Sequence, residues 1–426
     1  MILKLKNFKI SLFISAIFSI FLSQITYLDG ERISLNFRYA EVLIFLCLAF
    51  FILFGLSKEK WKYRPPTLEI LLFFNSLILS VIAVFFYYDI ELSGVNFIFI
   101  STYVFIHNLV IVHIVFEERN SIKLVYAKYI KNIFEWSVIF AVVLYVLYFL
   151  GFNDIRLGIN SNTQYGIPRM FGFSPEPSHF SVMAWIVLYT VAYELLYKPR
   201  GPIINKRFIF AFFAFFAFIF SFSTTGYMFA LFTLFFSFFY IKFFYSASFF
   251  IVLIIVMFIL PMDYYIRISD SVSLEFQLLY DYFILKKEFI DLNYFPSSRV
   301  ISFIYELEII FNKLFLKFGI GLGAGGQTIL LNSIDGHFRG VIYVFIEYGI
   351  VGLLAIIFVL YRMFKNTTIF FKPLFLSYAV VSFFNTSGGI FSLDFLIVFY
   401  AIHLLSIDSK HSLVYKQNTL VKRGVI

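Results

Sequence analysis

A charged segment stiffened by prolines, residues 168–179, carries side chains that are suited to group transfer. It reads PRMFGFSPEPSH. Prolines on both sides of Glu176 restrict its backbone, and Ser178 is expected to cap the helix that follows. The segment fixes the guanidinium of Arg169, the carboxylate of Glu176 and the imidazole of His179 close together near the expected membrane surface. The alternative is an ordinary proline-rich start of a helix with solvated charges.

A second group of polar residues lies far downstream. Arg299 precedes an amphipathic stretch, a glycine-rich run GIGLGAGG occupies 319–326, and His337 and Arg339 follow it. Glu347 comes later, inside the next apolar run. The glycine run contains the letters of a dinucleotide fingerprint, but no strand is expected before it. A flexible or closely packed turn is therefore the better interpretation.

The composition indicates what must position these side chains. Of 426 residues, 61% are hydrophobic and only 14% are charged, and the mean hydropathy is +0.89. Soluble domains average about 45–50% apolar and about 25% charged residues. The sequence therefore predicts a single integral membrane domain over residues 1–426. It excludes a soluble enzyme, a disordered chain and, because Cys47 is the only cysteine, a disulfide scaffold.

Long apolar runs predict an all-α, polytopic membrane bundle of about 12 transmembrane helices. The run from 208 to 245 is too long for one span, and we divide it at the polar segment SFSTTG, residues 221–226. The expected spans are 8–28, 39–56, 67–87, 95–116, 133–151, 178–197, 208–222, 226–245, 247–266, 340–360, 369–386 and 391–407.

The basic residues predict the orientation of these spans. The net charge is +9, and the Lys and Arg residues gather in every second loop. This pattern favours cytoplasmic termini and gives the positive charge a membrane role, not one in binding nucleic acid. Two long loops then fall on the outer side, at 152–177 and 267–339. The second contains two amphipathic stretches that are expected to lie as helices in the outer interface.

The two polar segments together resemble bacterial oligosaccharide repeat-unit polymerases. The pattern RxxGxxxEPS at 169–178 is similar to the Arg-Gly-Glu-Pro-Ser signature of the O-antigen polymerase (Wzy) family. The order Arg299, glycine-rich turn, His337, Glu347 resembles the large periplasmic loop of the wider polymerase and O-antigen ligase superfamily. The SFSTTG segment is similar to a polar turn between consecutive spans of those proteins. Many members have Asn directly after the His, where this chain has Phe338.

This resemblance implies a GT-C-like enzyme of the bacterial inner membrane. Its substrates would be oligosaccharides linked to undecaprenyl pyrophosphate, which it would polymerise at the periplasmic face into O-antigen, capsular or exopolysaccharide. A flippase and a chain-length regulator would be its protein partners, and the lipid bilayer its surroundings.

The chemistry of this reaction suggests roles for seven residues. A departing lipid pyrophosphate needs cations, and arginine supplies a permanent charge with bidentate geometry. No Asp-x-Asp or His-x-x-x-His motif accompanies the arginines, so we expect transfer without a metal or another cofactor. For His179, a structural role at the start of the helix is the alternative. We assign His337, Glu176 and Arg299 to catalysis, and Arg169, Arg339, Glu347 and His179 to substrate binding.

Three other functions are considered for the same sequence. An O-antigen ligase that transfers glycan to lipid A core belongs to the same superfamily, but the Glu-Pro-Ser element favours the polymerase. A flippase or transporter for the lipid-linked oligosaccharide is expected to carry polar groups at the membrane midplane, not in outer loops. A membrane O-acyltransferase would place its histidine in the membrane or toward the cytoplasm, unlike His337.

Overall fold

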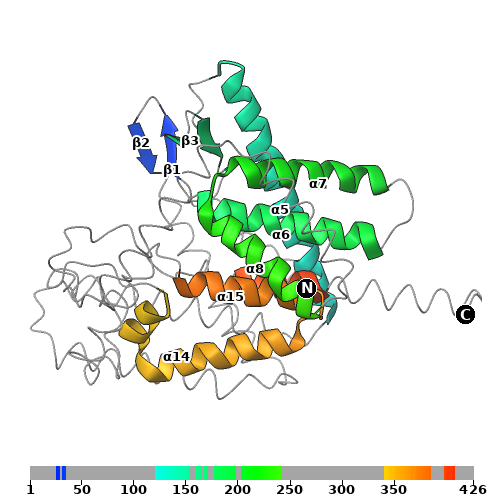
Figure 1. Ribbon diagram of the computed structural model, residues 1–426, viewed down its shortest axis with the longest axis vertical. Coiled ribbons are helices and arrows are strands. Elements are labelled where there is room, and N and C mark those ends of the chain that lie inside the picture. The colour runs from blue at the N-terminus through cyan, green and yellow to red at the C-terminus, as the bar shows by residue number, and fades with distance from the viewer. Residues whose placement is uncertain are drawn as a thin grey trace, which may run out of the picture.

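The computed structural model describes ten parts of the chain: residues 25–28, 31–34, 120–152, 159–164, 167–170, 172, 177–197, 203–240, 340–384 and 398–407. This described part is mostly helical (Figure 1). Its helices are α5 (Asn120–Phe149), α6 (Pro177–Tyr197), α7 (Ile203–Phe220), α8 (Thr224–Tyr240), α14 (Gly340–Asn366), α15 (Lys372–Phe384) and the short helical segment Val398–Ile407.

Within these ranges, one helix is long and apolar enough to cross a membrane, the stretch Lys123–Phe149 of α5. At about 1.5 Å per residue it exceeds the roughly 30 Å of a bilayer core. α5 begins at Asn120, earlier than the expected 133, and its first turns contain Lys123, Lys128 and Lys131, which interrupt the apolar run. Shorter apolar helices cover Arg207–Phe220, Thr225–Tyr240 and Val398–Ile407. The expected spans 39–56, 67–87, 95–116 and 247–266 and the second long loop, 267–339, lie outside the described residues.

Two small hairpins correct the all-α prediction. In the first, β1 (Ile25–Leu28) pairs antiparallel with β2 (Glu31–Ser34), so the expected span 8–28 is wrong at its end. Thr26 and Tyr27 favour extended backbone, and the sequence between the strands is Asp-Gly, which favours a two-residue turn. In this hairpin the backbone groups of 25–28 bond to those of the neighbouring strand and not along a helix.

The second hairpin lies inside the first long loop. β3 (Ile159–Gln164) pairs antiparallel with β4 (Ile167–Met170), and the register sets Ile159 against Met170 and Asn160 against Arg169. β4 packs against α5, α6 and α7, and Met170 is completely buried. This loop therefore folds back onto the helices and brings Arg169 with it.

Helix α6 lies at the centre of the described helices, in contact with α5, α7 and α8 (Figure 1). Every residue from 180 to 187 is buried, as expected for a helix that is apolar on all sides. α15 packs against α8 and α14, and the hydroxyl of Tyr189 on α6 donates to the Phe370 carbonyl oxygen at 2.7 Å. The chain breaks between α7 and α8 at 221–223, which confirms the predicted division of the run 208–245.

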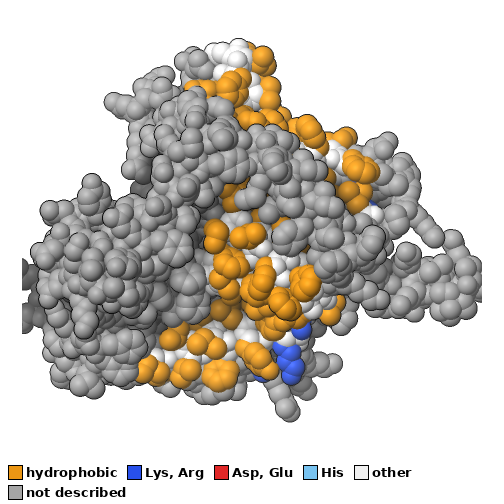
Figure 2. Space-filling view, in the orientation of Figure 1, with side chains coloured by type: hydrophobic (Ala, Val, Ile, Leu, Met, Phe, Trp, Pro, Cys, Tyr) orange, Lys and Arg blue, Asp and Glu red, His pale blue; other side chains and the backbone are white. Residues whose placement is uncertain are grey.

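The described helices bury carboxylates and expose large apolar side chains. Glu135 and Glu194 are only 9% and 5% exposed, whereas Trp136, Phe212 and Phe239 are 62%, 65% and 66% exposed. Figure 2 shows apolar side chains spread over the visible face of these helices. Soluble monomers rarely expose extended apolar patches. Buried carboxylates beside exposed aromatic side chains are the reverse of the usual distribution in a soluble monomer.

Candidate functional site

Arg169 extends from β4 to the turn that joins α7 and α8. Its Nε donates to the backbone oxygen of Ser221 at 3.2 Å, and the side chain is partly exposed. The two residues are 52 positions apart in the chain. The hydrogen bond therefore brings two sequence motifs, RxxGxxxEPS and SFSTTG, into direct contact.

The backbone next to Arg169 is anchored to the helices. The hydroxyl of Tyr145 on α5 donates to the Pro168 carbonyl oxygen at 2.9 Å. Tyr145 is only 2% exposed, and its ring packs against those of Phe149 and Phe220 at centroid distances of 5.0 and 5.6 Å. A buried hydroxyl with a backbone partner fixes both groups. The attachment point of Arg169 is thus held by α5 and α7.

Gly172 brings the chain close to the helices after β4. Its φ of +57° lies in the left-handed region, which favours glycine. A Cβ at this position would lie 2.8 Å from the Ala141 Cβ and 3.2 Å from the Phe180 Cε2. Glycine is therefore required at this position for two reasons, the positive φ and the lack of space for a Cβ. Its small size lets this segment lie directly against α5 and α6.

The polar residues of the turn between α7 and α8 satisfy the helix ends. Ser221 Oγ donates to the Phe218 oxygen at 2.7 Å, and the Tyr227 hydroxyl donates to the Ile219 oxygen at 2.8 Å. Ser223 Oγ accepts from the Gly226 N–H at 3.3 Å, as an N-cap of α8. These contacts use carbonyls and N–H groups that a helix end leaves without an intrahelical partner.

Ser178 is not at the N-cap position of α6, contrary to the sequence prediction. The helix begins at Pro177, so Ser178 lies within its first turn, where its carbonyl accepts from Ser181 Oγ at 2.9 Å. Proline suits the first helical position because its missing N–H would have no partner there. His179 follows in the same turn and is partly exposed.

Gly226 allows α8 to approach α6 closely. A Cβ at this position would overlap the Oγ and Cβ of Ser181. We expect Gly226→Ala to lower the free energy of unfolding by about 1–3 kcal/mol, the usual cost of an overpacked core. Thermal unfolding of the purified protein in detergent measures the effect. Adding Ser181→Gly should restore most of the lost stability, with Ser181→Gly alone as the control, and a Gly226→Ala protein as stable as wild type would contradict this contact.

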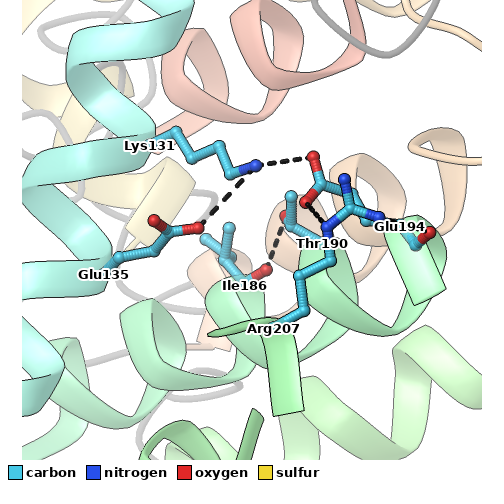
Figure 3. Close-up of polar contacts among 6 residues, drawn as sticks. All are labelled: Lys131, Glu135, Ile186, Thr190, Glu194 and Arg207. Atoms are coloured by element: carbon cyan, nitrogen blue, oxygen red, sulfur yellow. Dashed lines mark hydrogen bonds and ion pairs between the residues drawn. The ribbon is translucent and has the colours of Figure 1, made fainter. Parts of the chain in front are cut away.

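A cluster of four charged residues lies at the other end of the same helices (Figure 3). Lys131 Nζ on α5 lies 2.5 Å from Glu194 Oε1 and 3.8 Å from Glu135 Oε1. Arg207 of α7 places its Nε 3.4 Å from Glu194 Oε2, and its Nη1 donates to the Glu194 backbone oxygen at 3.2 Å. Two cations and two carboxylates cancel, so the cluster offers no excess charge to a ligand. Its effect is to join α5, α6 and α7.

The predicted site residues are described to different extents. For Arg169 and His179 the structure describes the side chains. For Glu347 it describes only the backbone, which lies in α14. In the described ranges, no group of three His, Cys, Asp or Glu side chains is placed to hold a metal ion. The residues that lie outside the described part are His337, Glu176, Arg299 and Arg339.

Two residues that shape the surroundings of Arg169, Tyr145 and Phe222, carry no signal of this role in the sequence. Tyr145 has no distinguishing signal, because a tyrosine in an apolar run is typical of any buried helix. Phe222 lies between the two serines of the turn and has a φ of +45°. Glycine is the usual residue in this left-handed conformation, so a phenylalanine in the sequence does not indicate that the backbone adopts it.

The chemical capacity of the site follows from Arg169. A guanidinium carries a permanent positive charge and five N–H donors in one plane, a geometry that matches phosphate and carboxylate oxygens. The Nε contact and the anchored backbone hold this group at the end of the bundle, where it is partly exposed. The arrangement is suited to binding an anion. No family model, no curated protein and no solved structure matches this chain.

Proposed function

We propose that this protein is a membrane glycosyltransferase of the oligosaccharide repeat-unit polymerase type. It transfers a growing glycan from undecaprenyl pyrophosphate onto the next lipid-linked repeat unit at the outer face of the bacterial inner membrane. The observation that carries the proposal is the contact between Arg169 and the Ser221 carbonyl. It joins two segments on which the resemblance to these polymerases rests.

The packing of the helices supports a place in the membrane. Exposed aromatic side chains and buried carboxylates fit an apolar surrounding, and α5 has the length of a span. The Lys131–Glu194–Arg207 contacts bring together the start of α5, the end of α6 and the start of α7, all of which the charge pattern assigns to the cytoplasm. β4 and the α7–α8 turn meet near the other end of α5 and α7, where Tyr145 and the Ser221 carbonyl contact β4. About twelve spans with cytoplasmic termini accommodate this arrangement.

The proposed reaction breaks the bond between the anomeric carbon of the donor and its pyrophosphate oxygen. A hydroxyl of the acceptor sugar forms the new glycosidic bond, and its proton passes to a base, for which Glu176 and His337 are the candidates. Negative charge develops on the departing pyrophosphate, and cations aimed at that charge lower the barrier. Arg169 and Arg299 supply them in this proposal.

The remaining candidates belong to substrate recognition. Arg339 would contribute a further cation, and Glu347 and His179 would bind sugar hydroxyls. A flippase that delivers the lipid-linked units and a regulator of chain length would work beside the enzyme. Arginines rather than a metal ion neutralise the leaving group in this scheme.

A strain that lacks this protein provides the test. We expect its surface glycan to carry a single repeat unit, and expression of the full-length chain to restore the ladder of long chains, as judged by electrophoresis of the extracted glycan. A long polymer stranded on its lipid carrier would instead indicate the ligase. Loss of every repeat from the outer face would indicate a flippase, and an unchanged ladder would contradict all three.

A further inference from the structure

Phe222 has a backbone conformation that a phenylalanine rarely adopts. Its φ is +45°, and its side chain is only 4% exposed. L-residues avoid the left-handed region because Cβ crowds the following carbonyl oxygen. Such a conformation persists where the surroundings enforce it, and it is common at functional sites.

The contacts of the turn show what enforces this conformation. The N–H of Phe222 donates to the Ile219 oxygen at 3.1 Å, the bond that closes a helix C-terminus before a left-handed residue. Its ring packs edge-on against Phe220, with centroids 5.9 Å apart and planes at 82°. Ser223 directly after it caps α8. The backbone is thus fixed on both sides, and burial of the ring holds the residue between them.

The left-handed residue determines where the Ser221 carbonyl points. In a continuing helix this oxygen would accept from the N–H four residues later, that of Thr225. Because the chain leaves the helix at Phe222, the Ser221 oxygen is released and accepts from Arg169 Nε instead. A guanidinium is planar, so a bond at Nε restricts the orientation of the whole group.

We propose that Phe222 is a positioning residue for Arg169. Its left-handed backbone holds the Ser221 carbonyl against Arg169 Nε and thereby orients the guanidinium toward its anionic ligand. The effect on catalysis rests on the proposed function, whereas the coupling between Phe222 and Arg169 does not.

Two substitutions separate the backbone from the ring. Phe222→Gly removes the ring but adopts a positive φ without penalty, whereas Phe222→Val keeps more apolar volume but is strongly disfavoured there. The left-handed penalty separates glycine from any residue with a Cβ and corresponds to roughly a 5- to 30-fold difference in population. Phenylalanine already bears this penalty in the wild-type protein, and the branched Cβ of valine adds to it. We therefore expect polymer elongation to be about fivefold or more higher in Phe222→Gly than in Phe222→Val, although valine keeps more of the buried volume.

Phe229 provides the matched control. It is a fully buried phenylalanine inside α8, with ordinary helical backbone. Glycine is worse than valine in the interior of a helix, so the order of the two substitutions should be reversed at this position. Valine better than glycine at both positions would overturn the proposal, because Phe222 would then contribute only its ring.

A thermal-unfolding cycle tests the coupling without any activity. Arg169→Met should lower the melting temperature by the same amount in the wild-type and Phe222→Gly proteins, and by much less in Phe222→Val, where its partner carbonyl is already displaced. An equal shift in all three backgrounds would overturn the proposal. If Phe222→Val does not accumulate, Phe222→Ile takes its place, because isoleucine has the same branched Cβ and fills more of the space that the ring leaves. Coupling in a chain that fails to restore polymer would refute the proposed function and leave the positioning role intact.

Discussion

Arg169→Ala is expected to reduce polymer elongation at least 100-fold while the protein still accumulates in the membrane. Removal of one group that stabilises developing negative charge typically costs about 10²–10³ in rate. The elongation rate of Arg169→Lys should lie between those of the wild type and Arg169→Ala. Lysine keeps the charge but loses the planar group that contacts the Ser221 carbonyl. Rates with purified protein and lipid-linked repeat units, together with the glycan ladder in cells, measure the effect.

Arg362→Ala is the matched control for this prediction. Arg362 is an exposed arginine near the end of α14, in a segment that the charge pattern assigns to the cytoplasm. The same change of side chain at that position should leave chain length unchanged. A full ladder from Arg169→Ala would show that Arg169 has no part in the proposed binding of pyrophosphate. A loss in Arg362→Ala as large as that in Arg169→Ala would show that the effect is not specific to the site.

Glu194→Ala is expected to destabilise the folded protein by about 3–5 kcal/mol, the cost of leaving buried charge without its partner. Glu194 is 5% exposed and is shared by Lys131 and Arg207, whose side chains are themselves only 21% and 16% exposed. Its removal leaves two mostly buried cations to face each other. The yield of folded protein in detergent and its thermal unfolding measure the loss.

Two further variants show whether charge is the cause. Lys131 and Glu135 lie one turn apart on α5, and their separation of 3.8 Å makes this contact weaker than the 2.5 Å contact between Lys131 and Glu194. Glu135→Gln should therefore cost much less than Glu194→Ala. A triple variant, Lys131→Met, Glu194→Leu and Arg207→Met, should recover part of the stability, because an apolar replacement of a whole buried ionic group is often neutral. Wild-type stability in Glu194→Ala would contradict the role of Glu194 in joining α5, α6 and α7.

The helices of this protein were largely predictable because they depend on local sequence. Apolar runs of about 20 residues indicate where α5, α6, α7, α8, α14 and α15 lie, and a short polar segment separates α7 from α8. The first turns of α5 were missed since lysines interrupt the apolar run there. Both hairpins were missed because their strands are short. The first begins inside the expected span 8–28, and the second lies inside the expected loop 152–177.

The sequence by itself determined which segments are apolar, that the chain turns between α7 and α8, and which side chains have the chemistry to bind an anion. Only the tertiary structure decided that Arg169 meets the Ser221 carbonyl, that Phe222 adopts a left-handed backbone and that Glu194 joins three helices. These features depend on pairs 52 or 63 residues apart and on side-chain packing between helices. Hydropathy and spacing along one chain report burial and period, but they do not report which buried surfaces face each other.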